Sequence, residues 1–225
     1  MKNKVLVIAV HPDDETLGCG GTLLKHKRNG DDINWLIVTG PTQNHPYGFK
    51  KEFIEERNQL IQAVNVAYDF NHKYELNFPT QLLHNIDLRE IIIKIDEIIS
   101  KVQPNILYMM FYQDVHSDHR IAFEAVYSCT KSFRKPYIEQ IYMMETLSET
   151  EFAPAIPVLS FVPNVYVDIT DFFEKKIEII KLYNTELMQA PYPRSLTTIE
   201  SLARYRGSRA GVSYAEAFML LYQKL

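Results

Sequence analysis

The sequence has 225 residues and a formal net charge of −4, from 24 basic and 28 acidic side chains. The two signs are mixed along the chain, so the sequence predicts no basic surface of the kind that binds nucleic acid. No apolar run approaches the ~18 to 20 residues that cross a bilayer. The apolar start at 5–10 is too short for a signal peptide. These observations predict a cytoplasmic protein without a membrane span.

A chain of this length with 46% hydrophobic residues can bury one core, which predicts a single domain over residues 1–225. Its two cysteines, Cys19 and Cys129, are too few for a disulfide framework. We expect both to pack as small apolar side chains.

Short apolar, β-branched runs alternate with segments of helical spacing along the chain. This alternation predicts an α/β, Rossmann-like fold, in which a mostly parallel sheet carries helices on both faces. In chain order the pattern predicts a strand at 4–10, a helix at 15–28, a strand at 33–39, a loop at 40–48, a helix at 51–65, a strand at 66–70, a helix at 88–100, a strand at 106–111, a helix at 120–130, a strand at 138–144, a loop at 147–163, a strand at 164–169, and helices at 171–183, 197–206 and 214–221.

An imidazole and three carboxylates, in His11-Pro-Asp-Asp-Glu15, directly follow the first predicted strand. Ligands of open parallel sheets bind at the carboxyl ends of the strands. A nucleotide-binding protein would have a glycine-rich phosphate loop here, whereas carboxylates repel phosphate and attract a cation. Taken alone, the cluster is explained equally well as a helix N-terminus, where carboxylates offset the helix dipole.

A second donor cluster, Asp114-Val-His116-Ser-Asp118-His119, follows the strand predicted at 106–111. By itself such a stretch also fits imidazoles and carboxylates that pair on a surface. A catalytic zinc site needs about three protein ligands, and two loops at the same sheet edge can supply them together. His116 and His119 are three residues apart, so one can bind a metal while the other faces the substrate.

Both clusters resemble known motifs: "AVHPDDETLGCGGTL" and "DVHSDH" are similar to those of the GlcNAc-phosphatidylinositol de-N-acetylase family, also called PIG-L or LmbE-like. "NVYVDIT" and "RSLTTIESLARYRGSRAGVSYAEAF" also resemble segments of its bacterial members, so the resemblance covers nearly the whole chain. It implies a Rossmann-like fold and zinc-dependent removal of acetyl groups from N-acetylglucosamine-type sugars. One Zn²⁺ per chain is expected, with Fe²⁺ as an alternative metal.

The resemblance also implies a role for individual residues. The expected metal ligands are His11, Asp14 and His119, and the expected general base is Asp13. His116 matches the residue that stabilises the oxyanion. On this interpretation His116 is protonated, and Asp118 keeps it charged and oriented.

The sequence departs from the family pattern at Ser117, where proline is frequent, which affects the stiffness of the loop more than its chemistry. Arg57 is the nearest candidate for a substrate-binding arginine, although its flanking residues fit the family pattern poorly. The residue that protonates the leaving amine is left open.

Two other functions are compatible with the clusters. A metal-dependent phosphoesterase also uses carboxylates and histidines, but usually around two metal ions. A catalytically silent sugar-binding protein would keep the fold and lose the base, yet Asp13 is present. The expected partner is a small N-acetylated amino sugar or glycoconjugate, whose aglycone the sequence does not identify. Whether the chain forms a homo-oligomer is also open.

Overall fold

Seven strands of the described residues form one sheet in the order β3-β2-β1-β4-β5-β7-β6. The computed structural model describes residues 2–42, 45–46 and 48–225, so positions 43, 44 and 47 of the predicted loop 40–48 lie outside the described residues. The strands are β1 (Lys4–Ala9), β2 (Asp32–Gly40), β3 (His72–Pro79), β4 (Ile106–Met109), β5 (Gln140–Met144), β6 (Val165–Asp168) and β7 (Ala215–Gln223). The first five are parallel, whereas β7 runs antiparallel to both β5 and β6.

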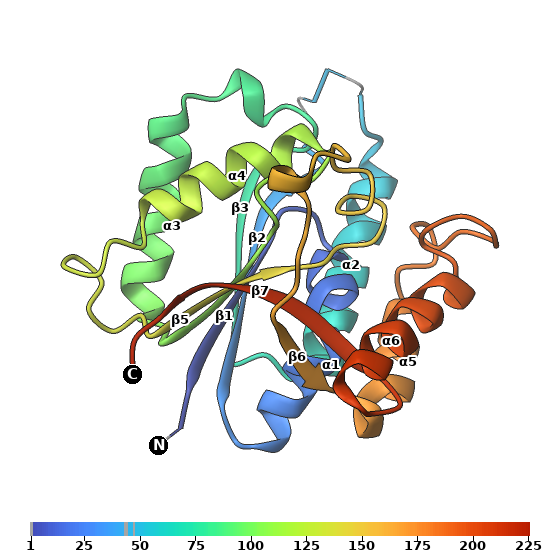
Figure 1. The fold of residues 1–225 in the computed structure, drawn as a ribbon. Coiled ribbons are helices and arrows are strands. Elements are labelled where there is room, and N and C mark those ends of the chain that lie inside the picture. The colour runs from blue at the N-terminus through green and yellow to red at the C-terminus, as the bar shows by residue number, and fades with distance from the viewer. Residues whose placement is uncertain (1, 43–44, 47) are drawn as a thin grey trace.

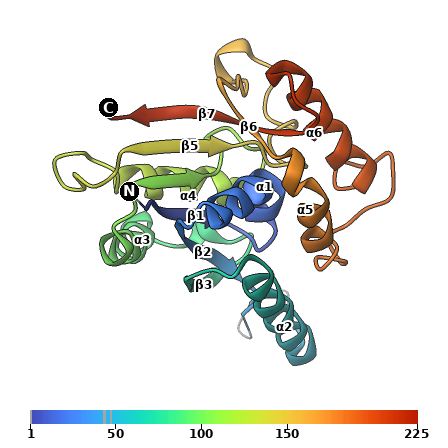
Figure 2. The same cartoon turned by 90° about the horizontal axis from the view of Figure 1, so that it is seen from below.

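Helices cover both faces of this sheet (Figures 1 and 2). They are α1 (Asp14–Arg28), α2 (Lys51–Tyr68), α3 (Leu88–Val102), α4 (Ser117–Ser128), α5 (Phe173–Ile180) and α6 (Leu196–Ala210). Three short 3₁₀ turns lie at Leu83–Asn85, Pro157–Leu159 and Thr170–Phe172. The described helices include none that is long and apolar enough to cross a membrane.

Strand β1 is buried on both faces, which explains its uninterrupted apolar sequence. Val5 and Val7 belong to the core beneath α1, α2 and α5, while Leu6 and Ile8 belong to the core beneath α3 and α4. The predicted Rossmann-like arrangement with a mostly parallel sheet is therefore confirmed.

Two of the predicted elements are wrong. Residues 66–70 are not a strand, because α2 continues to Tyr68 and turns its apolar stripe, which includes Val64, toward the core. The third strand along the chain is β3, a half-exposed edge strand. Its sequence mixes polar and apolar residues and contains no buried apolar run that would have predicted it. Residues 214–221 are strand β7 instead of a helix, because pairing with β5 and β6 outweighs the helix propensity of its Ala, Glu, Met and Leu residues.

The order of the strands determines where a ligand can bind. The chain leaves β1 toward β2 on one side and returns to β4 on the other, so the connections diverge above β1 and β4. Such a switch point opens a crevice at the carboxyl ends of the strands. Both clusters found in the sequence lie there: His11 follows β1, and His116 and His119 follow β4.

Candidate metal centre and active site

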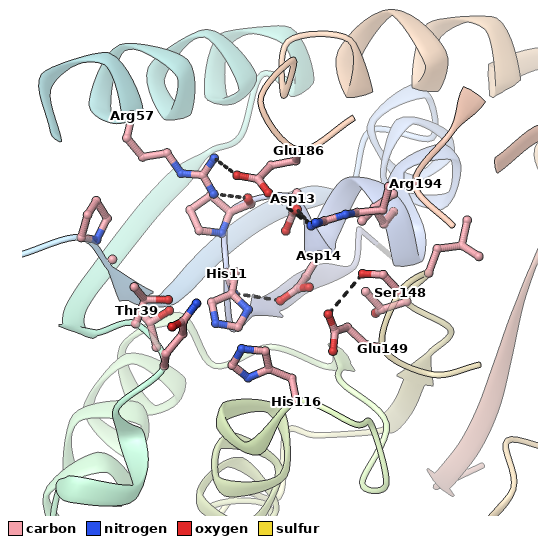
Figure 3. A pocket seen from close by; sticks show the side chains of 18 of the residues that line it. His11, Asp13, Asp14, Thr39, Arg57, His116, Ser148, Glu149, Glu186 and Arg194 are labelled. Carbon is pink, nitrogen blue, oxygen red and sulfur yellow. Dashed lines mark hydrogen bonds and ion pairs between the residues drawn. The ribbon is translucent and has the colours of Figure 1, made fainter. Parts of the chain in front are cut away.

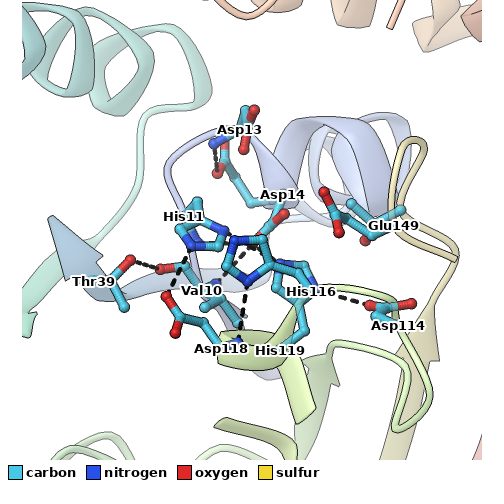
Figure 4. Close-up of polar contacts among 12 residues, drawn as sticks. Val10, His11, Asp13, Asp14, Thr39, Asp114, His116, Asp118, His119 and Glu149 are labelled. Atoms are coloured by element: carbon cyan, nitrogen blue, oxygen red, sulfur yellow. Dashed lines mark hydrogen bonds and ion pairs between the residues drawn. The ribbon is translucent and has the colours of Figure 1, made fainter. Parts of the chain in front are cut away.

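Side chains from two distant loops converge on one point above β1 and β4 (Figure 4). His119 Nε2 lies 3.3 Å from His11 Nδ1 and 3.3 Å from the Oδ2 atom of Asp14. His119 and Asp14 are buried, whereas His11 is partly exposed. One imidazole nitrogen from each histidine and one carboxylate oxygen thus form a group that can hold a metal ion. These are the three residues that the family resemblance implied as metal ligands.

Carboxylates hold the opposite nitrogen of each imidazole. Asp114 Oδ2 lies 2.8 Å from His119 Nδ1, and Asp118 Oδ2 lies 3.4 Å from His11 Nε2. A ring N–H donated to a carboxylate leaves the lone pair of the other nitrogen directed at the shared point, as in carboxylate–histidine–zinc sites. Asp14 Oδ2 is fixed by the backbone N–H groups of Val10 and His11. The donor set therefore fits a divalent cation such as Zn²⁺.

The charges at this point also favour a cation. Burial opposes the ionisation of Asp14, but His119 and His11 lower its pKa below the ordinary value. Burial likewise disfavours a charged His119, but Asp14 and Asp114 raise the pKa of this imidazole well above its usual range. The cluster thus stabilises one positive charge among its carboxylates, which a proton or a metal ion can supply.

A second group, made of His11, His116 and Asp118, also has its donor atoms close together. In this group the single lone pair of His116 Nδ1 already accepts the N–H of Asp118, whereas the Asp14 carboxylate keeps acceptor sites beside its two backbone bonds. The group with Asp14 and His119 is therefore the better candidate for the metal.

The predicted general base, Asp13, lies beside the ligand Asp14 and lines the same pocket. Its φ of 139° is unusual for a residue other than glycine, and such strain persists only where the surroundings hold it. Glu15 Oε2 accepts the N–H of Asp13, while Glu15 Oε1 accepts the hydroxyls of Thr16 and Tyr183. The buried Glu15, whose pKa burial raises to about 7, is thus a support for the base.

Two arginines and a glutamate surround Asp13 at the pocket wall (Figure 3). Arg194 Nη1 lies 3.4 Å from Asp13 Oδ2, and Arg57 donates to the carbonyl oxygen of Pro12 over 2.7 Å. Burial and the adjacent Asp14 raise the pKa of Asp13 well above its ordinary value, against the opposing effect of both arginines. A carboxyl group in this setting is prepared to accept and hold a proton.

His116 lines the pocket, but its surroundings differ from the prediction. It is the N-cap residue of α4, and its Nδ1 accepts the backbone N–H of Asp118 over 3.1 Å. Burial, together with the nearby His11 and His119, lowers the pKa of His116 to about 4. The Asp118 carboxylate, which was expected to hold a protonated His116, contacts His11, Gln81 and Leu83 instead.

The pocket has a volume of about 300 Å³, near the lower end for small-molecule sites. Its lining combines His11 and Asp14 with the Asp13 wall, two phenylalanines and the start of the predicted loop 147–163. These residues include Leu17, Thr39, Pro41, Phe49, Phe53, Thr80, Gln81, Thr146, Leu147, Ser148 and Glu149.

Sequence analysis gave no role to Glu186 or Arg194, which lie between α5 and α6, although the segment that resembles bacterial family members begins at Arg194. It also gave no role to Glu149, whose pKa burial raises to about 7, or to Asp114, the partner of His119. Asp114 could have been found from its place in the second donor cluster. Arg57 was found and does line the pocket.

Fold and site together define an α/β protein with a pocket at its switch point whose donor atoms could hold a metal ion. The model of the GlcNAc-PI de-N-acetylase (PIG-L) family matches residues 6–130, more than half of the chain, and the protein belongs to this family. The diacetylchitobiose deacetylase of Thermococcus kodakarensis is 25% identical over 226 residues, covering 95% of this chain and 81% of that protein.

Solved structures share the fold over nearly the entire chain. The conserved protein TT1542 from Thermus thermophilus has a TM-score of 0.78 at 23% identity and covers 99% of this chain and 96% of its own. GalB, the 4-carboxy-2-hydroxymuconate hydratase from Pseudomonas putida, has a TM-score of 0.74 at 16% identity, and the match covers 100% of this chain and 98% of GalB. Since the hydratase GalB shares this fold, the fold alone does not identify the reaction, which has to be argued from the site.

Proposed function

We propose that the protein is a zinc-dependent N-deacetylase that hydrolyses the acetamido group of an N-acetylglucosamine-type sugar. One observation carries the proposal: the carboxylate-supported group of His11, Asp14 and His119 lies beside a second carboxylate, Asp13, that the group does not use. This is the combination that metal-assisted amide hydrolysis requires. Membership in the family and the deacetylase activity named for the Thermococcus relative support the same reaction.

The residues around the cluster have separate roles in this reaction. A Zn²⁺ ion held by His11, Asp14 and His119 would supply Lewis acidity to the amide carbonyl and to water. Asp13 takes a proton from the attacking water as the new C–O bond forms. His116 donates its Nε2–H to the developing oxyanion as a neutral imidazole. When the C–N bond breaks, the proton held by Asp13 is available to the leaving amine, and acetate is released.

Asp118 has a positioning role in this proposal instead of the catalytic role expected from the sequence. Its carboxylate is held by the N–H groups of Gln81 and Leu83 and aligns the ligand His11. Its own N–H fixes the orientation of the His116 ring. Arg57 and the pocket volume suit a sugar ring bound through its hydroxyl groups.

The deciding experiment assays the metal-loaded protein against a panel of N-acetylated sugars and measures free amine and acetate. Asp13→Ala is expected to keep the metal and to lose nearly all turnover, whereas His11→Ala or His119→Ala is expected to lose the metal. One zinc ion per chain, measured by mass spectrometry, would separate this reaction from that of a two-metal phosphoesterase. Zinc binding without product from any sugar would contradict the proposal, as would full activity of Asp13→Ala.

A further inference from the structure

Glu186 lies between the two arginines of the pocket wall and binds both (Figure 3). Its Oε1 atom is 3.3 Å from Arg57 Nη1, and its Oε2 atom is 3.2 Å from Arg194 Nη1. Each carboxylate oxygen therefore forms an ion pair with one guanidinium group, so the single negative charge of Glu186 is shared between the two arginines. Arg194 Nη1 also contacts Asp13, so both arginines are paired with acidic groups of the protein.

This pairing takes place inside the pocket. The side chains of Arg57, Arg194 and Glu186 are only 11%, 22% and 29% exposed, so water screens their charges less than at an open surface. All three line the cavity beside Asp13. An anionic ligand that reached these guanidinium groups would have to displace Glu186 and leave its carboxylate without a cation.

A neutral hydroxyl group can bind to the same side chains without displacing Glu186. It can accept an N–H from either guanidinium and donate to a lone pair of Glu186, since a carboxylate accepts about four hydrogen bonds. Arg194 Nε is buried and has no hydrogen-bond partner within the described part of the chain. Glu149, which also lines the pocket, adds a further acceptor.

We infer that Glu186 makes the pocket selective for neutral N-acetylated sugars, because it withholds Arg57 and Arg194 from substrates that carry a carboxylate or a phosphate. The inference rests on the proposed deacetylase function and goes beyond it, since it concerns the rest of the substrate. It places Glu186 among the residues that determine specificity. Recognition of a bidentate anion by these arginines would require Glu186 to be absent or neutral.

The test compares three N-acetylglucosamine derivatives: the methyl glycoside, the carboxymethyl glycoside and the 6-phosphate. For the wild-type protein we expect kcat/KM on the neutral methyl glycoside to exceed both acidic values by roughly tenfold or more. For Glu186→Gln, the ratio of acidic to neutral kcat/KM is expected to rise by about tenfold for at least one acidic compound. Metal content and circular dichroism verify that the variant folds.

Glu200→Gln is the matched control, because it also removes a glutamate from an arginine pair, with Arg204, but away from the pocket. Its ratio should equal that of the wild type. The inference would be overturned if the wild-type kcat/KM values on the acidic and neutral compounds lay within threefold of one another. It would also be overturned if the ratio of acidic to neutral kcat/KM were unchanged in Glu186→Gln. If no compound releases acetate, the proposed function fails, and calorimetric binding of the same three compounds then decides the charge preference separately.

Discussion

His116 and Asp118 are joined through the backbone: the N–H of Asp118 donates to Nδ1 of the His116 ring over 3.1 Å. A nitrogen that accepts a hydrogen bond carries no proton, so the proton of the neutral ring is on Nε2. A doubly protonated ring would lose this N-cap bond. The same contact that begins α4 therefore selects the tautomer that can donate to an oxyanion.

We predict that His116→Ala lowers kcat by about 10²- to 10³-fold, the usual cost of losing one oxyanion donor. The metal content should stay the same, because His116 is outside the preferred ligand group. His116→Gln keeps an N–H donor, so its kcat should fall less than that of His116→Ala. Nitrogen-15 chemical shifts of the wild-type ring report the tautomer directly. A protonated Nδ1, or a wild-type kcat in His116→Ala, would contradict this role.

Thr150 supports the metal centre from a distance. Its hydroxyl donates to Asp114 Oδ1 over 2.7 Å, while Asp114 Oδ2 holds the ligand His119. Thr150→Val leaves this oxygen of a buried carboxylate without its donor, and we expect metal affinity to fall by about 10- to 100-fold. Competition with a chelator measures the change. Thr150→Ser keeps a hydroxyl and should bind metal nearly as the wild type does, so equal losses in both variants would assign the effect to packing.

The sequence placed both donor clusters at one edge of the sheet because each directly follows a parallel strand, and the family resemblance then implied His11, Asp14 and His119 as the metal ligands. It did not reveal Glu186 or Arg194, since their approach to Asp13 depends on how the segment between α5 and α6 packs against α2. The contacts of the Asp118 carboxylate were not foreseen for a related reason. Gln81 and Leu83 bind Asp118 through their backbone N–H groups, and a backbone contact does not depend on which side chain the residue carries, so the sequence gives no signal for it.

Strand prediction succeeded for the buried runs of β1 and β4 and failed for β3 and β7. β1 and β4 are uninterrupted apolar runs, whereas β3 is an edge strand of mixed polarity. β7 has the composition of a helix and becomes a strand only through its two antiparallel neighbours. Long-range pairing of this kind outweighs local propensity and has no local signal.

Cys129 should be unreactive in the native protein. The thiol is 4% exposed, and burial together with the nearby Asp96 raises its pKa to about 12. The thiolate is the reactive form, so a raised pKa lowers reactivity at every pH below it. Cys19 is buried, and its pKa is raised as well. Intact-mass measurement after iodoacetamide treatment at pH 8.5 should show no modification in buffer and two modifications in urea. Rapid labelling in buffer would contradict this burial.

Lys176 and Glu216 form a buried ion pair that holds α1 against β7. Their side chains are 5% and 4% exposed, and Lys176 Nζ lies 2.8 Å from Glu216 Oε1. Helix α1 is kinked at Cys19, and Glu216 accepts the N–H groups of Gly21 and Thr22 just beyond the kink. The carboxylate thus replaces helical acceptors, and Lys176 balances its charge.

Removing only the cation of this pair should lower the stability of the fold. Lys176→Met leaves the Glu216 carboxylate buried without its cation, so we expect a loss of about 3 to 5 kcal/mol in the free energy of unfolding. The neighbouring Lys175 is 53% exposed and pairs with the exposed Glu178, so Lys175→Met should change stability by less than about 1 kcal/mol. Urea unfolding of both variants measures the difference. Equal midpoints would mean that the three remaining hydrogen bonds to Glu216, from the N–H groups of Gly21 and Thr22 and from the Thr22 hydroxyl, compensate its charge without Lys176.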